Sequence, residues 1–236
     1  MIQQDPFIKR MKDWSLQSHK IGITDSEGPV ITISREYGCY GEEVAEELAK
    51  KLTELNQQKK EKRVWASVSS EILEEAAKLL EVESSDITHI FGAEEKGLFK
   101  DVLRAFKDYD KYTSDVSIKR TLANVVRSYA RRGNSIIVGR AGCVLVRPII
   151  ERAVHVRLVA PYHWRVKRIQ ERLDMTKRQA LKHVNNVDKK RIKFMDFYKG
   201  NKPDSELFDL VLNRSHLSTE EIVEHISLLA KQKNLY

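Results

Sequence analysis

Residues 30–52 change their hydrophobic period halfway along, and this constrains the fold more than any other feature of the sequence. Residues 30–33 (VITI) form a β-branched run, the composition of a strand buried on both faces of a parallel sheet. Gly38 and Gly41 then mark a turn, and after Glu42 the apolar residues recur at helical spacing. These residues are Val44, Leu48 and Leu52, flanked by Ala45 and Ala49. The stretch therefore predicts a buried strand, a glycine-containing turn and an amphipathic helix.

The turn is a candidate site for an anion, with phosphate as the expected anion. A helix N-terminus offers unpaired backbone N–H groups and the positive end of the helix dipole. The ordinary G-x-x-x-x-G-K-[ST] phosphate loop is absent, because Gly41 and Glu42 stand where its lysine and its Ser/Thr would be. Glu42 suits the dipole but would repel a phosphate, and Arg35 is the only cation in the turn. Spacing alone leaves two interpretations open: a phosphate site, or a strand-to-helix turn without a ligand.

Further apolar runs predict the rest of one α/β domain. Residues 64–68, 135–139, 154–159 and 208–212 are expected to be strands, and helical periodicity covers residues 71–80, 113–132, 162–172 and 176–199. Ser218 and Glu221 predict a capped closing helix. We expect an α/β domain of three α/β/α layers over residues 29–236, with a parallel sheet of about five strands. Residues 1–28 are polar and are expected to form an N-terminal extension.

Composition narrows the class of partner. The net charge of +8 and the pI of about 9.3 favour anionic partners such as nucleotides, nucleic acid or acidic lipid. Cys39 and Cys143 form no CxxC pair, so neither a disulfide framework nor a metal site is predicted, and a reducing cytoplasm fits. No apolar run reaches the roughly 18–20 residues of a membrane span, and the N-terminus lacks the apolar core of a signal peptide.

Three charged residues outside the turn are further candidates for the site. Arg140 follows the predicted strand 135–139, which places it at the same sheet edge as Arg35. Asp188 and Arg191 fall inside the apolar arc of the long helix, where charges need a partner. They are either a plain salt bridge with i,i+3 spacing, or an arginine that its own carboxylate orients toward a phosphate.

Four segments of the chain, taken in order, resemble the cytidylate kinase-like family of P-loop kinases. They are SREYGCYG (34–41), IIVGRAG (136–142), APYHWRVKRIQERLDMTKRQALKHVNNVDKKR (160–191) and FDLVLNRS (208–215), and the resemblance runs from about residue 29 to residue 230. It implies the P-loop NTPase fold, with a flap-like insertion at about 83–112 and lid-like helices at about 161–199.

The resemblance also implies which residues bind and act. Arg35, Arg140 and Arg191 would be the catalytic arginines, which hold the acceptor and donor phosphates. The nucleotide- and phosphate-binding set would be Ser34, Arg35, Gly38, Cys39, Tyr40, Gly41, Glu42, Arg140, Asp188 and Arg191. The sequence departs from the family where Cys39 and Tyr40 replace the usual glycine-rich continuation, and where Ala141 stands in place of an aspartate of cytidylate kinases.

The activity implied by the resemblance is ATP-dependent phosphoryl transfer to a nucleoside monophosphate such as CMP or dCMP. ATP and Mg²⁺ would be the cofactors, and small nucleotides the partners. One alternative is a catalytically impaired relative that binds nucleotide or phosphate as a sensor or a partner-binding protein. A less favoured one is a nucleic-acid-binding protein, suggested by the stripe of Arg120, Arg127 and Arg131, with which no aromatic residues interleave. The oligomeric state stays open.

Overall fold

The structure is a computed structural model that describes residues 28–69 and 115–236. Apart from Gly28, the expected N-terminal extension lies outside the described residues. So do the expected flap at 83–112 and the expected helix at 71–80. Within the described ranges, no helix is both long and apolar enough to cross a membrane.

A five-stranded parallel sheet in the order β2-β3-β1-β4-β5 forms the centre of the molecule. The strands are β1 (Val30–Arg35), β2 (Ala66–Val68), β3 (Ser135–Val138), β4 (Ala153–Val159) and β5 (Leu210–Asn213). Val30 of the central strand pairs with Ser135 on one side and with Ala153 on the other. The predicted fold, three α/β/α layers around a five-stranded parallel sheet, is confirmed.

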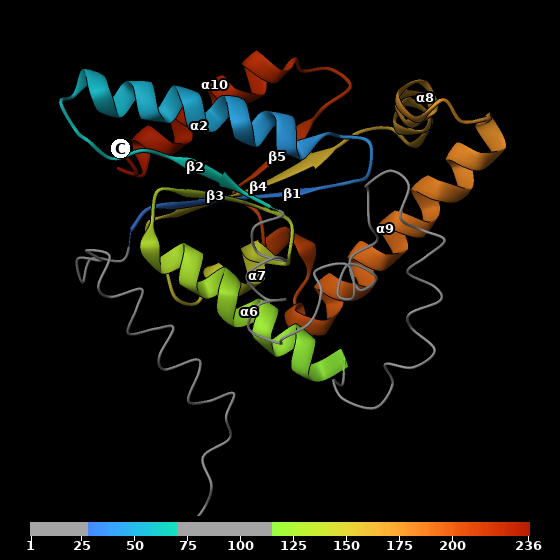
Figure 1. The fold of residues 1–236 in the computed structure, drawn as a ribbon, viewed down its shortest axis with the longest axis horizontal. Coiled ribbons are helices and arrows are strands. Elements are labelled where there is room, and N and C mark those ends of the chain that lie inside the picture. Colours follow the sequence, from blue (N-terminus) through green and yellow to red (C-terminus); the bar gives the residue numbers. More distant parts are fainter. Residues whose placement is uncertain (1–27, 70–114) are drawn as a thin grey trace, which may run out of the picture.

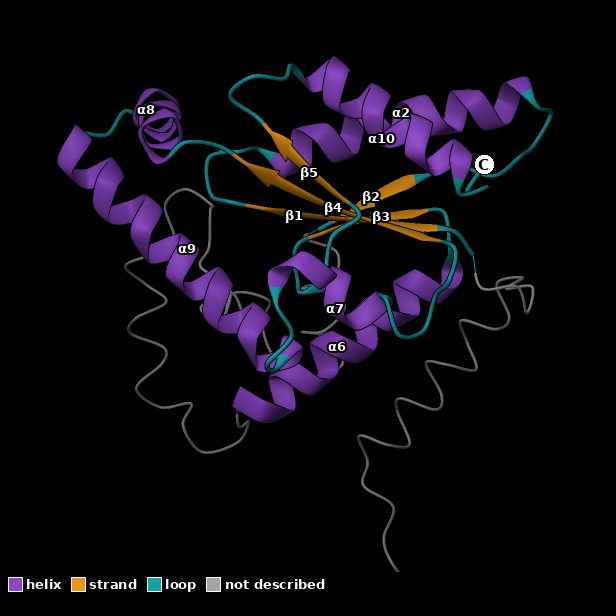
Figure 2. Ribbon diagram, turned by 180° about the vertical axis from the view of Figure 1, so that it is seen from behind, coloured by secondary structure: helices purple, strands orange, loops and turns teal. Residues whose placement is uncertain are grey.

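Helices cover both faces of the sheet and extend beyond one end of it (Figure 1). One face carries α2 (Gly41–Gln58) and α10 (Thr219–Gln232), and the other carries α6 (Asp115–Arg132) and the short α7 (Gly142–Val146). Beyond the carboxyl ends of the strands lie α8 (Tyr162–Leu173) and α9 (Lys177–Lys199), as the view from behind also shows (Figure 2). The sequence predicted all of these except α7.

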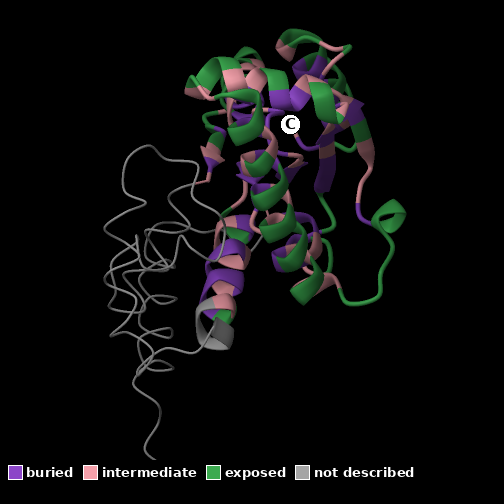
Figure 3. Ribbon diagram, turned by 90° about the vertical axis from the view of Figure 1, so that its right-hand side faces the viewer, coloured by how far each residue is buried: buried purple, intermediate pink, exposed green. Residues whose placement is uncertain are grey.

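The core follows the predicted apolar stripes. The strands are largely buried, as are the helix faces turned toward them (Figure 3). Val44, Leu48 and Leu52 of α2 are fully buried, which confirms the stripe that followed the turn. Helical spacing predicts that Ile192 belongs to the apolar arc of α9, and this is wrong. Ile192 lies outside the arc that packs on the domain and is 57% exposed. The residues of α9 that are buried are Ala180, Val184, Val187 and Phe194.

Two predicted helix ends are held by reciprocal hydrogen bonds. Ser218 accepts a hydrogen bond from the backbone N–H of Glu221, and the Glu221 carboxylate accepts one from the backbone N–H of Ser218. Thr176 and Gln179 make the equivalent pair at the start of α9. Each pair satisfies backbone donors that a helix N-terminus would otherwise leave open.

His155 of β4 makes the stability of the fold depend on pH. Burial, aided by the charge of Arg147, lowers the pKa of His155 from 6.5 to about 4, and its Nδ1 lies 2.8 Å from Oγ1 of Thr32. The unfolded chain therefore takes up a proton at higher pH than the folded protein, so this stability is full above pH 6.5 and is lost as pH falls toward pH 4. We expect the free energy of unfolding, measured with urea, to fall by about 2 kcal/mol from about pH 7.5 to about pH 5. His155→Asn should flatten that slope; an unchanged slope would assign it to other groups.

Candidate functional site

The loop between β1 and α2 has the turn geometry that the sequence predicts. Gly38 has a positive φ of 91°, and α2 begins at Gly41 immediately after Tyr40, which has φ 50° and ψ 54°. A Cβ on Gly41 would lie 3.2 Å from Cγ of Arg35, so this glycine lets the Arg35 side chain pass close to the helix start. The first N–H groups of α2 and a guanidinium are therefore brought to the same end of the sheet.

A cavity of about 190 Å³ opens between this loop and the helices α8 and α9. Three arginines from three segments line it, namely Arg35 at the end of β1, Arg172 of α8 and Arg191 of α9. Three glutamates line it as well, Glu36, Glu42 and Glu43. The cavity thus offers guanidinium groups for phosphate oxygens and carboxylates for a cation.

Glu42 pairs with Arg35. Nη2 of Arg35 donates to Oε1 of Glu42 over 2.5 Å, and the Arg35 side chain is only 8% exposed. Burial would raise the pKa of Glu42, but the charges of Arg35 and Arg191 outweigh it and hold that pKa below its ordinary value. The repulsion of phosphate that the sequence predicted for Glu42 is therefore offset by an adjacent cation.

Asp188 does not pair with Arg191 as the sequence suggested. Its carboxylate accepts hydrogen bonds from Nη1 of Arg165 at 2.6 Å and from the backbone N–H of Tyr37 at 2.8 Å. The ion pairs between described residues include no Asp188–Arg191 contact. Arg191 instead lies with Nη1 3.4 Å from the carbonyl oxygen of Arg35 and with its guanidinium 5.3 Å from the Tyr37 ring. The Asp188 carboxylate pairs with Arg165 because Arg165 is buried on the neighbouring helix, where its charge requires a partner.

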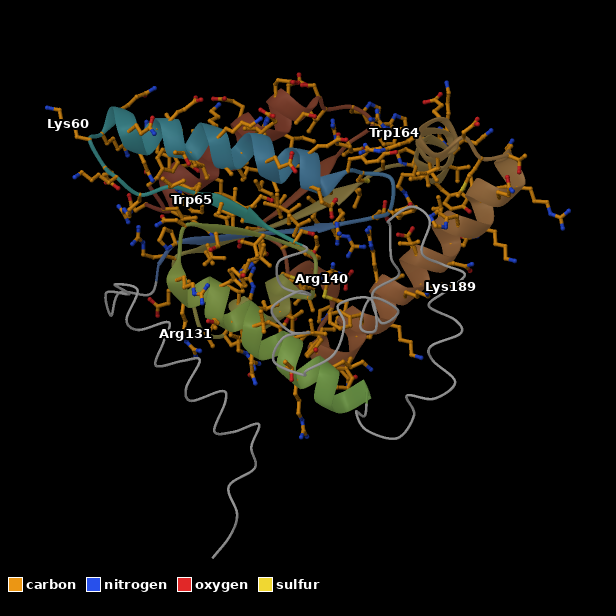
Figure 4. The ribbon with its side chains drawn as sticks, viewed as in Figure 1. Lys60, Trp65, Arg131, Arg140, Trp164 and Lys189 are labelled. Atoms are coloured by element: carbon orange, nitrogen blue, oxygen red, sulfur yellow. The ribbon has the colours of Figure 1, made fainter. Side chains whose placement is uncertain are left out.

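Arg140 follows Gly139, whose backbone contacts the side chain of Arg35. Gly139 packs so closely on Arg35 that a Cβ on this glycine would lie 2.1 Å from Nη1 of Arg35. Arg140 itself has φ 53° and lies on the side of the sheet that α7 covers (Figure 4). It is not among the described residues that line the 190 Å³ cavity. The structure therefore brings Arg35 and Arg191 into one cavity, and Arg140 is linked to it through its neighbour Gly139, which contacts Arg35.

Two other predicted residues serve packing. Cys39 is fully buried, and burial together with the charge of Glu36 raises the pKa of its thiol to about 12. The thiol therefore stays protonated and is unsuited to attack as a nucleophile. The Ser34 hydroxyl is also buried and lies 3.7 Å from Sγ of Cys143. Both residues support the loop from inside, whereas Gly38 and Tyr40 line the cavity.

Sequence reasoning missed the residues that surround Tyr40. The guanidinium groups of Arg168 and Arg172 lie 5.0 Å and 4.3 Å from the centroid of the Tyr40 ring, and its hydroxyl donates to the carbonyl oxygen of Arg168. The guanidinium of Arg168 also lies 4.9 Å from the centroid of the ring of Trp164, a residue of α8 that Figure 4 labels. The sequence did carry a signal for these residues. Arginines at 165, 168 and 172 recur at helical spacing, which predicts that they share one face of a helix.

Tyr40 holds a backbone conformation that costs a non-glycine residue about 1–2 kcal/mol. Tyr40→Gly and Tyr40→Ala both remove the ring and its arginine contacts, but only the glycine variant relieves the left-handed backbone. We expect Tyr40→Gly to be more stable than Tyr40→Ala by about 1 kcal/mol in urea unfolding. Equal stabilities would mean that the loop relaxes out of this conformation.

The described residues contain no group of three or more His, Cys, Asp or Glu side chains that could hold a metal ion.

Comparison with known proteins gives a family match over most of the chain. The sequence model of the cytidylate kinase-like family matches residues 30–216. A cytidylate kinase of Ignicoccus hospitalis is 32% identical over 113 residues, which are 48% of this chain and 64% of that protein. A cytidylate kinase of Staphylothermus marinus is 32% identical over 111 residues, which are 46% of this chain and 60% of that protein. Each alignment thus spans less than two thirds of the relative.

A solved structure shares the fold. The crystal structure of an uncharacterized protein from Eubacterium ventriosum superposes with a TM-score of 0.59 and covers 86% of this chain and 98% of that one. The two sequences are 20% identical, so the match concerns the fold alone.

Proposed function

The chain belongs to the cytidylate kinase-like family, and from this we propose that it transfers a phosphoryl group from ATP to a nucleoside monophosphate. CMP or dCMP is the proposed acceptor, since both relatives described above carry the name cytidylate kinase. The observation that carries the proposal is the convergence of Arg35, Arg172 and Arg191 on one cavity beside the N-terminus of α2.

The residues of the cavity fit a magnesium–nucleotide better than a bare anion. Arg35, Arg172 and Arg191 offer planar donors that suit phosphate oxygens. Glu42, at the start of α2, offers a carboxylate to a hard cation such as Mg²⁺. Bound Mg²⁺ would neutralise part of the charge that develops on the phosphate oxygens during transfer.

The chain's own contribution is to position groups and to balance charge. The acceptor is already an anionic phosphate, so no side chain has to remove a proton from it. Arg35 and Arg191 would take over the role that lysine plays in an ordinary phosphate loop, because their guanidinium groups lie in the cavity that the loop lines. We assign Arg140, which adjoins Arg35 through Gly139, to the acceptor phosphate. In this proposal residues 29–236 form the kinase domain, with residues 83–112 as the flap and residues 161–199 as the lid, and the protein works in the cytoplasm.

A second candidate is a relative that binds nucleotide or phosphate without transferring it. Two of the cavity's arginines already have carboxylate partners within the protein, since Arg35 pairs with Glu42 and Arg172 pairs with Glu43. A ligand phosphate would have to compete with these glutamates for the guanidinium groups. A sensor that responds only to high concentrations of nucleotide would have this property.

A coupled assay for ADP formation, with each nucleoside monophosphate in turn, tests the two candidates beside direct titration with ATP. Turnover that is fastest with CMP or dCMP supports the kinase. Binding of ATP without turnover, for any acceptor, supports the sensor. Absence of both would overturn the assignment of the cavity to nucleotide.

A further inference from the structure

Asp188 and Arg165 both bind the backbone of Tyr37, in the loop between β1 and α2. We propose that Tyr37, Arg165 and Asp188 form a latch that fixes the loop to α8 and α9, and that Asp188 and Arg165 are positioning residues of the site. This inference rests on the proposed function for its effect on catalysis, but the latch itself is a property of the fold. Figures 1 and 2 show α8 and α9 beside the loop that joins β1 to α2, at the carboxyl end of the sheet.

The latch is a closed set of three contacts between three segments. The backbone N–H of Tyr37 donates to Oδ1 of Asp188 at 2.8 Å. The backbone carbonyl of Tyr37 accepts from Nη1 of Arg165 at 3.1 Å, and the same Nη1 donates to Oδ2 of Asp188 at 2.6 Å. Both main-chain polar groups of Tyr37 are therefore bound by side chains from α8 and α9, which are also bound to each other.

Burial makes these contacts strong. Arg165 is 6% exposed, and a charge so buried needs partners in fixed positions. Its Nε donates to the carbonyl oxygen of Ala160 at 3.1 Å and lies 3.3 Å from Oε2 of Glu36. Glu36, which precedes Tyr37, also accepts from the backbone N–H of Ala160 at 3.0 Å. The residue before Tyr37 is thus held by the same arginine.

Gly38 shows that α8 shapes the path of the loop. A Cβ at this position would lie 3.1 Å from both Cβ and the carbonyl oxygen of Arg165, so the backbones of the loop and of α8 are in close contact there. The loop is therefore clamped at Glu36, at Tyr37 and at Gly38 by one turn of α8 around Arg165. Its own helix, α2, begins only at Gly41.

The latch also sets the position of Arg191. Asp188 lies almost one helical turn before Arg191 on α9, so the contact of Asp188 with Tyr37 N–H fixes that turn of α9 to the loop. Arg191 is thereby placed over the Tyr37 ring and next to the carbonyl oxygen of Arg35. Asp188 orients Arg191 through the backbone of α9 and the loop, without an ion pair between the two.

Hydrogen exchange of the Tyr37 amide in the nucleotide-free protein tests the latch directly. The hydrogen bond to the half-buried Asp188 carboxylate should slow this exchange, and Asp188→Ala should speed it by about tenfold to a hundredfold. Asp188→Asn keeps an acceptor oxygen but cannot balance the charge of Arg165, so its exchange rate should be intermediate. Asp196→Asn is the matched control, since Asp196 lies on the same helix and pairs with Lys199 at the surface; it should leave the Tyr37 rate unchanged.

Kinetics separate positioning from a merely structural role. We expect Asp188→Asn to raise KM for ATP about tenfold and to leave KM for the acceptor within about twofold, because the loop lines the donor cavity. A loss of folded protein would lower the apparent kcat and change neither KM. A Tyr37 exchange rate that is the same in the wild type, Asp188→Asn and Asp188→Ala would overturn the latch. So would a loss of turnover with unchanged exchange, which would make Asp188 a substrate contact. If the wild type shows no turnover with any acceptor, the proposed function fails, while the exchange measurement still decides the latch.

Discussion

Arg35→Ala is expected to slow phosphoryl transfer by about 10²- to 10³-fold, the usual cost of removing one preorganised donor from a charged transition state. Arg35 lines the cavity, its side chain is 8% exposed, and it pairs with Glu42. Its loss removes a positive charge and leaves the Glu42 carboxylate facing the phosphates. We therefore expect kcat/KM for ATP to fall, and KM to rise more for ATP than for the acceptor. Steady-state kinetics with both substrates varied measure these constants.

A control and a rescue sharpen this prediction. Arg157→Ala removes a guanidinium of β4 that pairs with Asp204 and does not line the cavity, and it should leave turnover unchanged. The double variant Arg35→Ala/Glu42→Gln separates two roles of Glu42. If its carboxylate only repels the phosphates once Arg35 is gone, the double variant should recover part of the affinity for ATP that Arg35→Ala loses. If its carboxylate binds the Mg²⁺ of the nucleotide, the double variant should bind ATP more weakly still. Near-wild-type rates for both Arg35→Ala and Arg191→Ala would show that these arginines do not carry the reaction.

The sequence predicted the sheet and the turn because both depend on local patterns. The β-branched run at residues 30–33 and the helical stripe of Val44, Leu48 and Leu52 each report which side is buried, and the structure places them so. The short helix α7 was missed because its five residues are too few for a periodic signal and follow Arg140 and Ala141, two non-glycine residues with positive φ.

The site was predicted less completely than the fold, because its contacts join residues that are distant in the sequence. Asp188 and Arg191 share a helix, so spacing favoured a pair between them. The carboxylate belongs instead to Arg165, which only the packing of α8 against α9 brings within 2.6 Å. The pairing of Arg35 with Glu42 was easier to predict, because the two residues are only seven positions apart across the turn. Even so, it required the close approach that Gly41 permits.

The role of Gly139 could not have been read from the sequence, where it stands as the last residue of an apolar run. In the structure it has φ 73°, and it leaves the space that the Arg35 guanidinium fills. A glycine at the end of a strand usually signals backbone conformation alone. Gly139 has this positive φ and also contacts Arg35 of the neighbouring strand. Because a side chain at this position would displace Arg35, its substitution tests the role of that arginine.

Gly139→Ala is expected to lower turnover nearly as much as Arg35→Ala, although it removes no charge. The new Cβ would lie 2.1 Å from Nη1 of Arg35, so the guanidinium must leave its place in the cavity. The positive φ adds a cost to stability of about 1–2 kcal/mol. Gly200→Ala isolates this second effect, because Gly200 also has a positive φ, 59°, but a Cβ there meets nothing within 4 Å. It should lose a similar amount of stability in urea unfolding and keep full activity.

The double variant Gly139→Ala/Arg35→Ala then decides whether the glycine acts through the arginine. If displacement of Arg35 is the whole effect, the added Cβ has nothing left to displace, and the double variant should turn over no more slowly than Arg35→Ala alone. Rate losses that multiply would instead show that Gly139 contributes by a separate route, such as the path of the backbone into Arg140. In that case the strain at the end of β3, where Gly139, Arg140 and Ala141 all have positive φ, would be the feature that sets the acceptor side of the site.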